Sequence, residues 1–137
     1  MSERKVTFTR EQIAAYADAS GDRNPIHLDD AFARSVGLPG LIAHGMLQMG
    51  IAATVAAEAA GGPANLRRMS VRFAGMVVPG DEVTFTAQAS GEGKLDVRAL
   101  NQRGEPALTK ATADYSHLPT AWGGRPGSQR DPGRVGT

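Results

Sequence analysis

The chain of 137 residues is predicted to form an α+β fold, because two kinds of apolar spacing follow one another along it. Apolar residues recur at helical spacing up to about residue 60 and alternate with polar residues from about residue 69. One long and largely apolar helix precedes the alternating segments. A curved antiparallel sheet wrapped around that helix would bury it. The length suits a single domain of this kind.

The first helix is expected to begin at Thr9, since Thr9-Arg10-Glu11-Gln12 has the form of a capping box. In such a box the Thr9 side chain accepts a hydrogen bond from the amide of Gln12, and the Gln12 side chain reaches back. Apolar residues then recur at helical spacing at Ile13, Tyr16 and Ala17. Ser20-Gly21-Asp22 is predicted to end the helix after about three turns.

Two more helices are predicted after a proline-containing loop. Residues 22–25 form the loop, because the residue before Pro25 is disfavoured in a helix. A short helix is expected over residues 28–35. The longest helix is predicted over residues 45–60, and Gly61-Gly62-Pro63 ends it.

The alternating part of the sequence predicts four strands, at residues 69–73, 82–87, 94–100 and 108–115. Turn residues separate them, so consecutive strands are expected to pair antiparallel as a meander. One layer of this kind leaves a sheet face and two edges exposed. A dimer that covers them is therefore expected.

Composition and charge exclude several classes of function. Fifteen basic and 14 acidic residues give a net charge of +1, so we expect neither nucleic acid nor a membrane as a partner. The absence of cysteine excludes disulfides, thiolate metal sites and a cysteine nucleophile. The apolar stretch at residues 41–60 is interrupted by His44, Gln48 and Glu58, which argues against a bilayer span.

The two ends of the sequence carry further expectations. The first residues lack the continuous apolar segment of a secretory signal, so a cytoplasmic location is expected. Residues 1–117 are expected to form the single domain. Residues 118–137 are rich in glycine and proline and are predicted to form a disordered tail.

A dense group of polar residues marks the candidate site. Asp22, Asn24 and His27 lie within six residues, and His44-Gly45 opens the longest helix. A carboxylate and an imidazole in a rigid loop indicate general acid–base chemistry, because the two groups can hold opposite protonation states near neutral pH. A structural explanation stays open, in which Asp22 is an Asx-turn acceptor and His27 a packed imidazole.

Metal binding is a weaker alternative. Histidines 27, 44 and 117 and nearby carboxylates offer ligand atoms, but no metal-binding spacing such as H-E-x-x-H occurs. We therefore predict neither a metal nor another cofactor.

The segment Asp22-Arg23-Asn24-Pro25-Ile26-His27 resembles the D-x-N-P-x-H motif of MaoC-like dehydratases and (R)-specific enoyl-CoA hydratases. Residues 40–47 (GLIAHGML) and the pair of segments 71–73 and 78–81 (VPGD) agree with that family in order and spacing. The resemblance covers about residues 6–117. It implies a hot-dog fold, in which a curved sheet wraps a central helix, with one strand short or absent because few residues precede Thr9.

The resemblance also implies the reaction and the roles of the residues. Asp22 and His27 match the catalytic pair, Asn24 the amide that orders the loop or a water, and Gly45 the glycine at the start of the helix. His44 is placed with Asn24 and Gly45 in the substrate-binding group, where it is expected to hydrogen-bond a loop carbonyl and fix the Gly45 amide. The reaction would be reversible hydration of a trans-2-enoyl thioester to a (3R)-3-hydroxyacyl thioester.

The implied partners are acyl thioesters of coenzyme A or of acyl carrier protein, bound by a homodimer. Three alternatives remain beside this prediction. One is a thioesterase on the same fold, which the hydratase motif disfavours. A second is a non-catalytic acyl-binding subunit of a hot-dog heterodimer, which would leave the complete Asp22 and His27 pair unexplained. The third is a fatty-acid or polyketide dehydratase that acts only on carrier-bound substrates.

Overall fold

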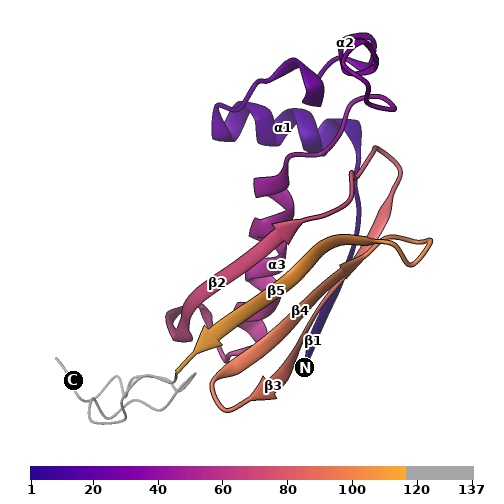
Figure 1. Ribbon diagram of the computed structural model, residues 1–137. Helices are drawn as coiled ribbons and strands as arrows, with labels where there is room; N and C mark the ends of the chain where they lie inside the picture. Colours follow the sequence, from indigo (N-terminus) through magenta and orange to yellow (C-terminus); the bar gives the residue numbers. More distant parts are fainter. Residues whose placement is uncertain (117–137) are drawn as a thin grey trace, which may run out of the picture.

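The computed structural model describes residues 1–116, which form a five-stranded antiparallel sheet with one long helix lying against it (Figure 1). The strands are β1 (Ser2–Thr7), β2 (Leu66–Phe73), β3 (Glu82–Gly91), β4 (Lys94–Leu100) and β5 (Pro106–Tyr115). The helices are α1 (Arg10–Ser20), α2 (Asp30–Ser35) and α3 (Gly45–Ala59), with short 3₁₀ turns η1 (Pro25–His27) and η2 (Pro63–Asn65).

Helix α3 lies in the curve of the sheet, and this arrangement confirms the predicted α+β hot-dog fold. Side chains of β4 alternate between exposed and buried along the whole strand, and those of β3 alternate between half-buried and buried from Glu82 to Ala87. The buried set from both strands meets the buried face of α3. Its members include Ala52, Val55 and Ala56 of α3, Val83, Phe85 and Ala87 of β3, and Val97 and Ala99 of β4.

The strand order is β1-β3-β4-β5-β2, so the predicted meander is confirmed only for β3, β4 and β5. The predicted pairing of β2 with the next strand, β3, is wrong, because β2 lies outside β5 at the sheet edge. The amides of Ala74 and Gly75 both donate to the carbonyl of Ala107, which holds the connection on β5 as it leaves β2. The turn residues Pro79-Gly80-Asp81 therefore end a long connection from β2 to β3 and do not form a hairpin between these two strands.

Strand β1 was not among the four predicted strands. Five of its six residues are polar, so the alternation that reveals a half-buried strand is missing. Pairing with β3, in which Val6 lies opposite Val83, supplies the main-chain hydrogen bonds. An ion pair of 2.9 Å between Arg4 and Glu58 ties the strand to α3.

Strand β5 carries a bulge that bends the sheet. Leu108 pairs with Ala99 and Ala111 with Val97, so β5 has one residue more than β4 between these pairs. Lys110 lies in the bulge with a φ of 48°, and it is the one non-glycine residue of positive φ among residues 1–116. Bulges increase local twist, which helps this sheet curl around α3.

No helix within residues 1–116 is both long and apolar enough to cross a bilayer. Residue 117 and the predicted tail at residues 118–137 lie outside the described part of the chain.

Candidate functional site

Helix α1 leads directly into the candidate site. The predicted N-cap is confirmed, since the Thr9 hydroxyl accepts a hydrogen bond of 3.0 Å from the amide of Gln12. The other half of the predicted capping box is not formed, because the Gln12 Oε1 atom is buried without a hydrogen-bond partner within residues 1–116. Gly21, with a φ of 80°, ends the helix and donates its amide to the carbonyl of Ala17. Asp22 follows at once.

Two side-chain turns fix the loop that carries Asp22. The amide of Asn24 donates to Oδ1 of Asp22 at 3.3 Å, and the amide of Ile26 donates to Oδ1 of Asn24 at 3.2 Å. Pro25 then begins η1, which ends at His27. Asp22 therefore is the Asx-turn acceptor that the structural explanation expected, but only one of its two carboxylate oxygens accepts this hydrogen bond.

The second carboxylate oxygen of Asp22 faces His27. The Nδ1 atom of His27 lies 2.8 Å from the carbonyl of Ile42, and a carbonyl only accepts, so Nδ1 carries the hydrogen. Nε2 is left 4.0 Å from Oδ2 of Asp22. That distance is too long for a direct hydrogen bond, but a water can bridge it. The His27 side chain is only 9% exposed and that of Asp22 55%, so the pair opens to solvent on the Asp22 side.

The main chain around Ile42 is held from three directions. The amide of Ile42 donates to the carbonyl of Ile26 at 3.1 Å, and the amide of Ala43 donates to the carbonyl of Val77 at 2.8 Å. Leu41 donates to Oδ1 of Asp30 at 2.9 Å. Sequence reasoning missed these anchors, because each involves a main-chain group of residues 41–43 that side-chain identity does not reveal.

Asp30 links this segment to α1. The Leu41 amide and, next to it, the Arg10 guanidinium hold the pKa of the Asp30 carboxyl below its usual value. The Arg10 contact is an ion pair of 2.8 Å. Asp30 therefore stabilises the site segment in its ionised form.

His44 and Gly45 complete the site at the start of α3. The His44 ring is 1% exposed and stacks on that of His27, with ring centroids 3.8 Å apart. Its Nε2 donates to the main-chain carbonyl of Asp22 at 2.9 Å, so the expected hydrogen bond to a loop carbonyl is present. Tyr16 lies edge-on against His44 with centroids 4.8 Å apart. The sequence placed Tyr16 only on the apolar face of its helix and gave no sign of this contact.

Gly45 leaves the first turn of α3 open. Within residues 1–116, no side chain caps that turn. A Cβ atom at Gly45 would lie 3.1 Å from the ring of Phe73, so glycine lets Phe73 pack at this position. The free amides of a helix N-terminus favour a partial negative charge. The structure thus brings Asp22, Asn24, His27 and His44 together, with Gly45 next in sequence.

The same group offers three side chains that could bind a metal, Asp22, His27 and His44, with ligand atoms within 4.8 Å of one another. The two imidazoles, however, are stacked at an interplanar angle of 22°. Their lone pairs lie in nearly parallel planes about one ring thickness apart, so one ion cannot lie in both planes. One nitrogen of each ring also donates to a carbonyl. The arrangement fits proton transfer and does not fit a metal ion.

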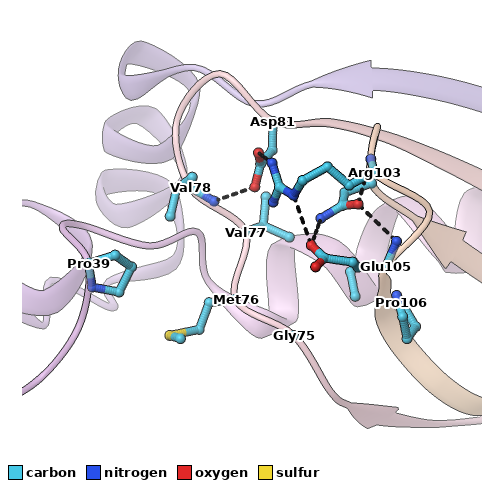
Figure 2. A pocket seen from close by; sticks show the side chains of 11 residues that line it. Pro39, Gly75, Met76, Val77, Val78, Asp81, Arg103, Glu105 and Pro106 are labelled. Atoms are coloured by element: carbon cyan, nitrogen blue, oxygen red, sulfur yellow. Dashed lines mark hydrogen bonds and ion pairs between the residues drawn. The ribbon is translucent and has the colours of Figure 1, made fainter.

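A separate pocket of about 450 Å³ lies between the connection to β3 and the turn from β4 to β5 (Figure 2). The buried Asp81 accepts hydrogen bonds there from the amide of Val78 at 3.0 Å and from the side chain of Gln102 at 2.9 Å. Arg103 lies 3.7 Å from the same carboxylate. None of the five predicted site residues lines this pocket. Its network fixes the connection that in turn holds Ala43.

The comparison with known families decides the relationship of the chain. A family model described as "MaoC like domain" matches residues 1–111. The chain belongs to the MaoC-like domain family. Among solved structures, this MaoC-like domain is similar to the (R)-hydratase from A. caviae involved in PHA biosynthesis, with a TM-score of 0.70 and 31% identity over 82% of this chain and 89% of that one. A MaoC-like dehydratase from Phytophthora capsici gives a TM-score of 0.75 and 27% identity over 83% of this chain and 39% of that one.

Curated relatives of this MaoC-like domain are much longer proteins. The fatty acid synthase subunit beta of Aspergillus oryzae is 35% identical over 115 residues, which cover 80% of this chain and 6% of the relative. The peroxisomal hydratase-dehydrogenase-epimerase of Neurospora crassa is 36% identical over 112 residues, which cover 82% of this chain and 12% of the relative. The chain therefore spans a small part of the length of either relative.

Proposed function

We propose that this MaoC-like domain is an (R)-specific hydratase or dehydratase that interconverts trans-2-enoyl and (3R)-3-hydroxyacyl thioesters. The observation that carries the proposal is the gap of 4.0 Å between Nε2 of His27 and Oδ2 of Asp22, two groups that can both hold one water. The names of the similar proteins, a hydratase and a dehydratase among them, support the same chemistry.

The pair supplies both proton transfers. In hydration the water oxygen attacks C3, one member of the pair accepts the water proton, and the other delivers a proton to C2. The double bond is thereby replaced by a hydroxyl on C3 and a hydrogen on C2. In dehydration the pair removes the C2 proton and protonates the leaving hydroxyl. Positioned acid–base groups contribute about 10²- to 10⁴-fold each to such steps.

The start of α3 supplies the charge stabilisation. Negative charge develops on the thioester oxygen when C2 carries enolate character. The open first turn at Gly45 offers main-chain amides and the positive end of the helix dipole to that oxygen. Asn24 holds the loop so that the water site and this oxygen site face one substrate.

The substrate and assembly are part of the proposal. The acyl group is carried as a thioester of coenzyme A or of acyl carrier protein, in the cytoplasm, and two copies of the chain form a homodimer. Exposed apolar side chains support the homodimer, since Met46, Phe73 and Met76 are 59%, 49% and 52% exposed near the start of α3 and the end of β2. The outer edge of β2 also has no neighbouring strand within residues 1–116.

Hydration of crotonyl-CoA tests the proposal, with chiral analysis of the product. The expected product is the (3R)-hydroxyacyl thioester, and Asp22→Asn and His27→Ala should each lower turnover about 10²-fold or more. Asp96→Asn, an exposed acid on β4, is the matched control and should keep wild-type turnover. Unchanged turnover in D22N would contradict the proposal.

The same assay separates the alternatives. A thioesterase would release free coenzyme A, and a thiol reagent detects it without background because the chain has no cysteine. A folded protein that hydrates carrier-bound but not coenzyme A substrates would be a carrier-specific dehydratase. A protein inactive on both, yet active when a second hot-dog chain is added, would be a subunit of a heterodimer.

A further inference from the structure

His44 contacts both members of the acid–base pair, although it is neither of them. Its ring lies flat on that of His27, with centroids 3.8 Å apart, and its Nε2 bonds the main chain of Asp22 at 2.9 Å. Tyr16 supports the ring edge-on from α1. The geometry of the 4.0 Å water gap therefore depends on where His44 lies.

The carbonyls around the two rings fix where their hydrogens are. A carbonyl accepts only, so the neutral His44 carries its hydrogen on Nε2 and the neutral His27 carries it on Nδ1. The two stacked imidazoles are thus held as opposite tautomers. In His27 this leaves the Nε2 lone pair free toward Asp22 and the water site.

His44 is held in this arrangement at a cost to stability. Its Nδ1 atom is buried without a hydrogen-bond partner within residues 1–116. The Oε1 atom of the buried Gln48, one helical turn later, also lacks a partner there. An unsatisfied buried polar atom destabilises the folded state. A phenyl ring would fill the space without it. The imidazole is therefore present for the bond that Nε2 makes, and not for packing alone.

We propose that His44 is a positioning residue that sets the distance between Asp22 and His27. It fixes the Asp22 loop by the main-chain carbonyl and limits the tilt of the His27 ring by stacking on it. The inference rests on the proposed hydratase or dehydratase reaction, in which that distance is the water site. His44 does not itself exchange a proton with the substrate.

Two variants separate the contacts of His44. His44→Gln keeps an N–H donor that can reach the Asp22 carbonyl, and His44→Phe keeps a flat ring but has no donor. We expect kcat of H44F to fall about 10- to 100-fold with KM nearly unchanged, because displacement of a reacting group by about 1 Å costs this much. H44Q, which keeps the donor but not the stacked ring, should recover part of that loss. The unfolding temperature of H44F should stay at or above that of the wild type. If His44 were purely structural, H44F would be less stable as well as less active.

Nitrogen-15 NMR of the histidine rings gives a readout that does not depend on turnover. The chain has three histidines, and His117→Gln removes the third signal and serves as the matched histidine-to-glutamine control. At about pH 8, where imidazoles are mostly neutral, His44 should carry its hydrogen on Nε2 and His27 on Nδ1.

The outcomes separate this proposal from the proposed function. Wild-type turnover by H44F, or a His44 hydrogen on Nδ1, would overturn the positioning role. If the wild-type protein hydrates no enoyl thioester, the proposed reaction fails. The ring signals then still test the bond from His44 to the Asp22 carbonyl. A His44 ring without a hydrogen on Nε2 would overturn that contact.

Discussion

Gly45 and Gly50 lie five residues apart in α3, and their surroundings differ. A Cβ atom at Gly45 would lie 3.1 Å from the ring of Phe73 at the candidate site, whereas a Cβ at Gly50 would meet nothing within 4 Å apart from its chain neighbours and the backbone of its own helix. The first glycine is required by a close contact. The second is a helix interior position where alanine is the better residue.

The matched pair Gly45→Ala and Gly50→Ala tests this difference. G45A should lower hydratase turnover about tenfold or more, because the added methyl displaces Phe73 and crowds the amides of the first turn. G50A should keep wild-type turnover and raise the free energy of unfolding by about 0.5–1 kcal/mol. Steady-state kinetics and urea unfolding measure both. Equal turnover of G45A and the wild type would contradict the role given to Gly45.

The sequence identified the members of the site but not their contacts. Asp22, Asn24 and His27 lie in one short motif, so their proximity follows from spacing alone. The stacking of His44 on His27 depends on the pairing of Ile42 with Ile26, and that pairing is made by main-chain groups. No pattern of side chains encodes it. Whether these residues act in catalysis stays a prediction that the variants above test.

At the scale of elements, Asp30 holds α2, the site segment and α1 in one unit. Its carboxylate accepts the amide of Leu41 and pairs with Arg10, and these contacts lower its pKa below the ordinary value of 3.8. A carboxyl whose pKa is lower in the folded state stabilises the fold fully at pH values above its unfolded pKa. That stabilisation is lost as the pH falls through the folded pKa.

Asp30→Asn should therefore destabilise the protein at neutral pH and lose this effect in acid. The difference in free energy of unfolding between D30N and the wild type is expected to be constant from about pH 7 to pH 5 and to shrink below about pH 4. Urea unfolding at several pH values measures it, with Asp96→Asn as the exposed control. A difference that does not change with pH would show that the carboxylate charge is irrelevant.

The elements themselves were predictable where side chains alternate or recur. The longest helix was predicted at residues 45–60 and is observed as Gly45–Ala59, and β4 was predicted with its observed bounds. Strand β1 was missed because its polar residues carry no such signal. The position of β2 beside β5 could not be read from the turn residues, because an eight-residue connection permits either neighbour.

At the scale of the whole molecule, the exposed apolar residues near the site predict how copies associate. Met76 is 52% exposed on the connection that holds Ala43. Contact with a second copy would cover Met76 and hold this connection, which bonds the main chain next to His44 through Ala43. Assembly and turnover are therefore expected to be linked.

Light scattering of the purified chain should give a mass of twice 14.3 kDa. Met76→Glu should shift the protein toward the monomer, because a buried carboxylate at an apolar interface is strongly unfavourable. Turnover should fall in parallel. Val36→Glu is the control, since Val36 is similarly exposed, at 55%, but lies at the C-terminal end of α2 and not on the connection to β3, so it should leave the dimer intact. A monomeric wild type would contradict the assembly.

The bulge in β5 gives the sheet a tolerance to a change in length. Leu108 and Ala111 both face the core although they are three residues apart, so removal of Lys110 would leave them two apart, as a regular strand requires. A chain shortened by this residue would keep Leu108 and Ala111 facing inward and would remove the register shift that this bulge causes against both β4 and β2. The shortened β5 would lose the local bend that the bulge produces. Most single-residue deletions in a strand reverse the faces of all residues that follow, whereas this one would mainly alter the curvature of the sheet.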